Sequence, residues 1–151
     1  MITTKTQFSV FLVNKPGVLA RVCGELGKAK INIEALTMMD SSEHGVLRLV
    51  AANSDKAREV LTRLNIPLTE TEVMAVEMPN HPGAMADVCG RLAEAHVNIN
   101  YAYITTGASG GKALAILKVA DTKKAMATLS DRRPRRREPP QKVRQSLSMR
   151  R

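Results

Sequence analysis

The chain has 151 residues, 44% of them hydrophobic but only 3% aromatic, so any core must consist of Val, Ile, Leu, Met and Ala. This length suits one ordinary domain or two very small ones. The formal charge of +9 is uneven, because residues 131–151 carry +7 and residues 1–130 only +2. No apolar run is long enough to span a membrane and no leader segment is evident, so we expect a cytoplasmic protein with no membrane contact.

The first 37 residues predict a strand, a helix and a second strand. Residues 7–13 are rich in β-branched and aromatic types, and they end at the turn sequence Asn-Lys-Pro-Gly of residues 14–17. Apolar residues in 18–29 recur at helical spacing on a single face. Residues 31–37 then alternate between apolar and polar types, which indicates a strand.

The next segment predicts a hairpin, a second helix and a fourth strand. A polar loop at residues 40–45 leads into a strand at residues 46–52. Residues 53–55 can cap a helix whose apolar stripe runs to residue 64, and residues 66–73 form a strand. The order strand, helix, strand, strand, helix, strand is that of a ferredoxin-like unit, an α+β fold with both helices on one face of an antiparallel sheet.

The chain contains this pattern twice. Residues 14–33 recur at residues 80–99 with no gap, and 11 of the 20 positions are identical, where chance would give about one. The repeated cysteines, Cys23 and Cys89, lie on apolar helix faces, and we expect them to be buried, reduced thiols. We therefore expect two ferredoxin-like units in tandem, at residues 1–73 and 74–131.

The repeat breaks after the second helix of the second unit. Residues 132–151 are rich in Arg and Pro where a final strand is due, so we expect a disordered tail and a second unit without its fourth strand. A partner chain, the N-terminus or nothing could cover the resulting sheet edge. A homodimer is our expectation for this reason.

The repeated residues could bind a small zwitterion. A helix that begins behind a Pro-Gly turn presents unpaired backbone N–H groups and a positive dipole end, which suit a carboxylate. Asn14 and Asn80 precede these turns, and Asn32 and Asn98 follow the helices; a carboxamide can both donate and accept a hydrogen bond. Asparagine is also common in turns and at helix ends, so spacing alone leaves a purely structural role open.

The motif Asn-x-Pro-Gly-Val-Leu-Ala with Asn-Ile about fifteen residues later, inside a βαββαβ unit, resembles the ACT domain. Residues 69–79 and 97–103 resemble the stand-alone tandem proteins of this family in particular. The resemblance implies a non-enzymatic regulator of amino-acid metabolism. In such a regulator an amino acid binds where two units pair and shifts the packing between the units. A partner enzyme then responds to that shift. The ligand-binding candidates are Asn14, Pro16, Gly17, Val18 and Asn32 in the first unit, and Asn80, His81, Pro82, Gly83, Ala84 and Asn98 in the second.

Two other function classes are weaker. The Arg-rich tail could bind nucleic acid or an acidic partner, but it has no aromatic residue for stacking on bases, so we expect no nucleic-acid binding. Catalysis is not expected either, because His44, His81 and His96 are dispersed and no nucleophile, metal or cofactor motif accompanies them. The sequence implies no cofactor. It does not identify the amino acid.

Overall fold

The computed structural model describes residues 1–39, 44–106 and 111–131. The predicted tail and parts of both predicted hairpin loops therefore lie outside the described residues. Within them, ten elements follow one another: β1 (Ile2–Val13), α1 (Val18–Lys28), β2 (Ile33–Met39), β3 (His44–Ala51), α2 (Ser54–Arg63), β4 (Leu68–Pro79), α3 (Ala84–Glu94), β5 (Ile99–Thr106), β6 (Lys112–Val119) and α4 (Thr122–Ser130). The α+β class and the order of the elements are confirmed.

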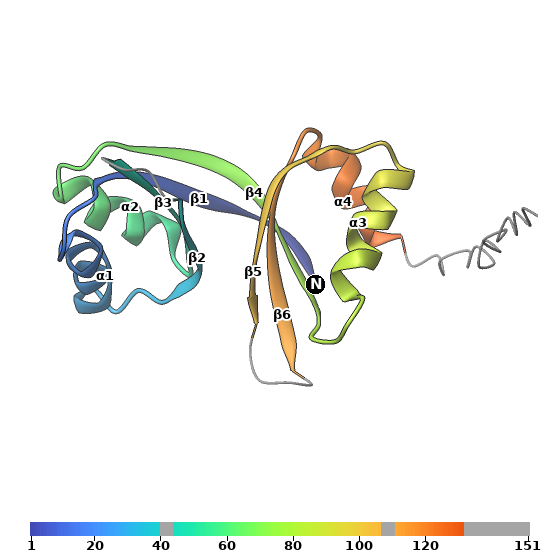
Figure 1. Cartoon of the computed structure of the whole chain (residues 1–151), viewed down its shortest axis with the longest axis horizontal. Coiled ribbons are helices and arrows are strands. Elements are labelled where there is room, and N and C mark those ends of the chain that lie inside the picture. The colour runs from blue at the N-terminus through green and yellow to red at the C-terminus, as the bar shows by residue number, and fades with distance from the viewer. Residues whose placement is uncertain (40–43, 107–110, 132–151) are drawn as a thin grey trace, which may run out of the picture.

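The described strands form one antiparallel sheet of six strands in the order β2-β3-β1-β4-β6-β5. Helices α1 and α2 cover one end of it, and α3 and α4 cover the other (Figure 1). The long strands β1 and β4 run through both ends and pair with each other from Ile2 opposite Val76 to Val10 opposite Leu68. In this ladder Thr6 lies opposite Glu72, its counterpart in the repeat, so the internal two-fold symmetry is centred on that pair.

Strands β1 and β4 each serve both halves, which completes both sheets. The second half contains β5, β6, the end of β4 and the start of β1, where Ile2 packs against the second core. The strand that we expected to be missing after α4 is thus supplied by the N-terminus, one of the three alternatives. The edge from which we argued for a dimer is therefore already paired. The expected boundary between residues 73 and 74 falls inside β4.

Each half has its own core between its helices and its sheet. Phe8, Val10 and Leu12 point from β1 into the first core, and Met74, Val76 and Met78 point from β4 into the second. In both β2 and β5 the pairing register shifts by one residue, between Ile33 and Ala35 and between Ile99 and Tyr101. The simple alternation that we expected for residues 31–37 is therefore interrupted by a bulge.

The helix-free faces of the two halves pack against each other. A third cluster joins Ala35 and Val50 of the first half to Ile116 of the second half. Val73 and Ala75 of β4 complete this cluster. Strand β2 consequently lies beside β5 in the middle of the molecule (Figure 1). Part of the sheet face that a single small unit would expose is thus buried between the halves.

Candidate functional site

The two Pro-Gly turns place glycine in the left-handed region at the start of α1 and α3. Gly17 has φ 87° and Gly83 has φ 92°, and at neither helix does a side chain cap the first turn. By contrast α2 and α4 are capped, because the side chains of Asn53 and Asp121 accept hydrogen bonds from backbone N–H groups of the first turn. The helices of the candidate sites are thus the two whose N-termini lack a side-chain cap, a geometry suited to a carboxylate.

Most of the candidate residues around these turns lie at the surface. Pro16 and Gly17 are exposed in the first half, as are Pro82 and Gly83 in the second. Val18 packs partly against the first core, and Ala84 is buried in the second core, so Ala84 offers a ligand its backbone N–H and not its side chain. Asn14 is exposed and Asn80 half-buried. Both already make an interaction within the protein.

His81 is the one titratable candidate in the turns. Its side chain is exposed, and Nδ1 lies 2.9 Å from the backbone oxygen of Pro82. Lys15 occupies the equivalent position in the first half. A side chain with a cationic form therefore stands beside each helix N-terminus.

Asn32 and Asn98 lie in the connections after α1 and α3. Their backbone oxygens accept hydrogen bonds from the N–H groups of Ala52 and Ala120, at 2.9 and 3.0 Å. Both asparagines are exposed. Neither takes the left-handed conformation of a helix cap, which falls two residues earlier, at Lys30 and His96. The structural explanation of these asparagines as helix caps is therefore wrong.

Within one half, the two asparagines do not meet. Asn14 precedes α1 and Asn32 follows it, and a helix of 11 residues is about 16 Å long. The same separation holds for Asn80 and Asn98 across α3, which also has 11 residues. A small amino acid cannot touch both ends of such a helix.

The two sites differ in charge. The first turn of α1 contains no acidic residue, whereas that of α3 contains Asp87. The residue of α1 that corresponds to Asp87 in the repeat is Arg21. The two helix starts therefore differ in charge, and Asp87 already makes an interaction within the protein.

The interface between the halves contains a buried polar network that sequence reasoning missed. Gln7 is fully buried; its Nε2 donates to the Tyr101 hydroxyl at 2.8 Å, and its Oε1 accepts from the Tyr103 hydroxyl at 2.9 Å. The Arg48 guanidinium lies 3.8 Å from the centre of the Tyr101 ring. Burial raises the pKa of the Tyr103 hydroxyl. Both tyrosines of the chain thus serve this interface.

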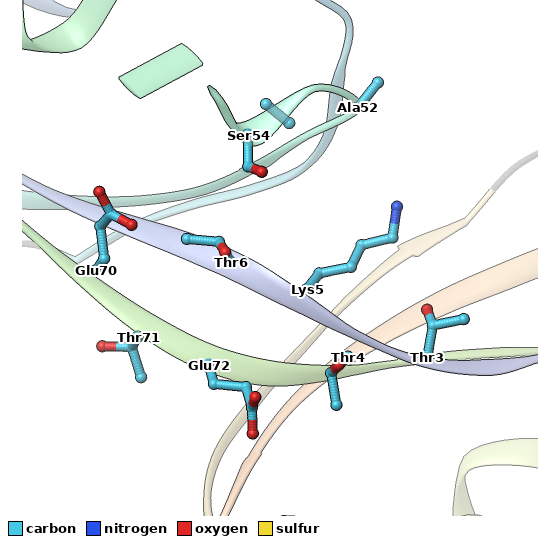
Figure 2. Close-up of a pocket in the computed structure, with 10 residues that line it drawn as sticks. Thr3, Thr4, Lys5, Thr6, Ala52, Ser54, Glu70, Thr71 and Glu72 are labelled. Carbon is cyan, nitrogen blue, oxygen red and sulfur yellow. The ribbon is translucent and has the colours of Figure 1, made fainter. Parts of the chain in front are cut away.

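Two cavities of the described residues lie away from both turns. One of about 550 Å³ follows the β1–β4 ladder near the start of α2 and is lined by Thr3, Thr4, Lys5, Thr6, Ala51, Ala52, Ser54, Glu70, Thr71 and Glu72 (Figure 2). Another of about 520 Å³ lies between α1 and α2 and is lined by Arg21, Glu25, Lys28, Ala29, Val60, Arg63 and Leu64. No candidate residue from the sequence lines either cavity.

The described residues contain neither a candidate metal site nor a membrane-spanning helix. No group of three or more His, Cys, Asp or Glu side chains could hold a metal ion in that part of the chain. No helix among those described is long and apolar enough to cross a membrane. Cys23 and Cys89 are free thiols, but they are half-buried and not buried as we expected.

Comparisons with known proteins identify relatives for the whole folded region. Residues 3–133 match the family model of the ACT domain pair. The crystal structure of protein BT0572 from Bacteroides thetaiotaomicron is 31% identical, with a TM-score of 0.77 over 85% of this chain and 88% of that one. The regulatory subunit of aspartate kinase from Thermus thermophilus, in its ligand-free form, is 17% identical and shares the fold, with a TM-score of 0.62 over 85% and 91% of the chains. No curated protein matches the chain.

Proposed function

The chain belongs to the ACT domain pair family, and we propose that it is a non-enzymatic regulator that binds a small amino acid at the N-terminal end of α1 or α3. The ligand contacts proposed are Asn14, Pro16, Gly17, Val18 and Asn32 in the first half, and Asn80, His81, Pro82, Gly83, Ala84 and Asn98 in the second. Binding alters the packing of the units, and this change regulates an enzyme of amino-acid metabolism. The regulatory subunits of aspartate kinase, which share the fold, are regulators of this kind by name.

The observation that carries this proposal is the contrast among the four helix N-termini. Side chains cap α2 and α4, while α1 and α3 begin at left-handed glycines without a side-chain cap. A ligand carboxylate can take the place of the missing side chain and accept hydrogen bonds from the first-turn N–H groups. Each such hydrogen bond contributes about 1.5–3 kcal/mol, so a few suffice for micromolar to millimolar affinity.

The distance between the asparagines requires a second unit at each site. Because about 16 Å of helix separates Asn14 from Asn32, one ligand can touch both types of asparagine only where two units meet. The second half of the same chain does not supply this contact, because α1 and α3 lie at opposite ends of the molecule (Figure 1). A second copy of the chain is the simplest source, which makes the active form a homodimer.

A thermal-shift screen of the whole chain against the twenty amino acids tests the function. A ligand that binds only the folded state raises the midpoint of unfolding, and we expect a selective rise for one or two amino acids. The Asn32→Ala and Asn98→Ala variants should reduce that rise, with affinity lowered by about tenfold or more. A flat screen on a protein that melts cooperatively would contradict the proposed function, and unchanged affinity in both variants would contradict the assigned residues.

A further inference from the structure

We propose that the groove between α1 and α2 is a docking surface for an acidic amphipathic helix of a partner protein. This inference rests on the proposed function for the existence of a protein partner, and it assigns the surface and the chemistry of the contact. The groove combines apolar and cationic side chains, and the repeat places different chemistry at the equivalent positions of α3 and α4.

The groove has an apolar floor and a cationic rim. Its cavity of about 520 Å³ is lined by three apolar residues, three cations and one carboxylate: Ala29, Val60, Leu64, Arg21, Lys28, Arg63 and Glu25. Val60 and Leu64 are half-buried against the first core, whereas the three cations are exposed. An apolar strip with cations beside it is complementary to a helix that carries apolar residues on one face and carboxylates along its border.

The carboxylate of the groove does not cancel its cations. Glu25 lies 2.7 Å from Lys28, and the hydrogen bond and charge of Lys28 lower the pKa of the Glu25 carboxyl. Arg63 lies 3.5 Å from Glu59, and both of these side chains are more than 65% exposed. Exposed ion pairs of this kind are weak. A carboxylate of a partner can therefore replace either internal pair, and it meets a surface with net positive charge.

The second half does not repeat this basic surface. A shift of 66 residues replaces Lys28 by Glu94, which reverses the charge. The same shift replaces Arg63 by Leu129, which is buried in the second core. These two cations are therefore not needed to build the shared fold. Their presence in the first half calls for another explanation, and a docking surface supplies one.

The position of Glu25 shows the same contrast. Its counterpart in α3 is Arg91, whose guanidinium donates hydrogen bonds to the backbone oxygens of Thr128 and Asp131 at the end of α4. The second half thus uses its cation internally, to bridge its two helices. Glu25 is an acceptor and cannot make this bridge to the end of α2. The cations of the first half instead border an open groove.

Charge and side-chain type decide which occupant fits. Residues 131–151 of the same chain carry +7, so the groove repels the Arg-rich tail. A nucleic acid would satisfy the cations, but no aromatic side chain lines the groove to stack on bases. It would also leave Val60 and Leu64 without an apolar partner. An acidic amphipathic helix satisfies both the cations and the apolar floor.

The test measures the binding of a fluorescent synthetic helix to the full chain by anisotropy, without any amino acid present. The helix carries Leu at i, i+3 and i+4 spacing and Glu on the flanking positions, and a second peptide has Gln in place of Glu. We expect the Glu peptide to bind and the Gln peptide to bind more weakly. The double variant Lys28→Glu, Arg63→Gln should weaken binding of the Glu peptide at least about fivefold.

The matched control is Lys123→Glu, Lys124→Gln on α4, which changes the charge by the same amount at exposed positions and should leave the affinity unchanged. NMR of the labelled full chain should place the largest shifts at Ala29, Val60 and Leu64. If a double variant fails to fold, Lys28→Gln and Lys123→Gln repeat the comparison.

The other outcomes overturn the proposal in distinguishable ways. No binding, equal binding of the two peptides, or equal affinities of the two double variants would show that the groove is not the docking surface. Equal affinity for a single-stranded oligonucleotide would contradict a protein partner, and a dimer lost only in the groove variant would assign the groove to a second copy. A flat amino-acid screen with peptide binding intact would contradict the proposed function alone.

Discussion

The candidate site depends on backbone conformation at single residues. Gly17 and Gly83 adopt a left-handed φ that L side chains rarely take, and this conformation lets each helix begin without a capping side chain. The sequence predicted both turns and both helix starts, because Pro-Gly is a strong local signal. It could not distinguish a turn asparagine from a ligand asparagine, since the two share the same local pattern. The structure excluded the helix-cap role of Asn32 by placing the left-handed residue at Lys30.

Two glycine-to-alanine substitutions test the left-handed backbone conformation at the start of α1. Gly17→Ala meets no atom within 4 Å, so its cost is the left-handed φ alone, and we expect a loss of about 1 kcal/mol in the free energy of unfolding. Gly24→Ala, inside α1 and equally free of contacts, should instead gain about 0.5–1 kcal/mol. Urea unfolding measures both. Equal effects of the two substitutions would contradict the assigned backbone conformation.

At the scale of elements, the order of helices and strands followed from apolar spacing, but the contact between the halves did not. Gln7 fits the alternation of apolar and polar residues along β1. Its partners Tyr101 and Tyr103, however, lie more than ninety residues away, and no local pattern predicts that pairing. The same limit hid the bulges in β2 and β5, which depend on the neighbouring strand. Local chemistry thus predicted the elements, and long-range packing decided which faces are buried.

The buried network predicts unequal effects of two similar substitutions. Tyr103→Phe removes the hydroxyl that donates to Gln7 Oε1 and should cost about 1–3 kcal/mol of stability. Tyr101→Phe should cost less, because Gln7 Nε2 keeps the Ser9 hydroxyl at 3.3 Å and the ring under Arg48 remains. Thermal unfolding of the two variants gives the comparison. A larger loss for Tyr101→Phe would show that the hydroxyl of Tyr103 does not fix the interface.

An ion pair between α2 and β4 predicts a pH dependence. The Arg58 guanidinium lies 2.5 Å from Glu70, and its hydrogen bond lowers the pKa of that carboxyl from 4.5. The stability from this pair is therefore present above pH 4.5 and lost as the pH falls through the lowered pKa. Arg58→Ala should reduce stability at neutral pH only slightly, because the pair is exposed to solvent, and it should bring the pKa of Glu70, followed by NMR, back toward its usual value. Arg63 lies on the same helix and pairs with Glu59 at 3.5 Å. Arg63→Ala should therefore leave the pKa of Glu70 unchanged.

At the scale of the whole molecule, the repeat closes on itself through the N-terminal end of β1. The sequence predicted that the second unit lacks a final strand after α4, and it left open what covers the edge. The structure supplies it from residues that precede the first repeat, because β1 extends past the symmetry centre at Thr6 and Glu72. Sequence periodicity could not reveal this, since the start of β1 belongs to the first half in sequence and to the second half in space.

The position of the start of β1 in the second half predicts that a single substitution there loosens the second half. Ile2 packs against the second core, and its counterpart Leu68 packs against the first. Ile2→Asp should therefore increase hydrogen exchange in α3 and α4, and Leu68→Asp should do so in α1 and α2. The two variants act as controls for each other. Faster hydrogen exchange in α1 and α2 in the Ile2→Asp variant would contradict the packing of β1 against the second half.

The most direct measurement of the central claim is an NMR titration of the labelled full chain with the amino acid that raises its unfolding temperature most. If the ligand carboxylate binds the uncapped helix start, the largest amide shifts will fall at residues 17–20, with a second group around Asn32, and Gly17→Ala will weaken them. Shifts centred on Thr3–Thr6 and Glu70–Glu72, in the cavity beside α2, would instead place the ligand elsewhere and contradict the account.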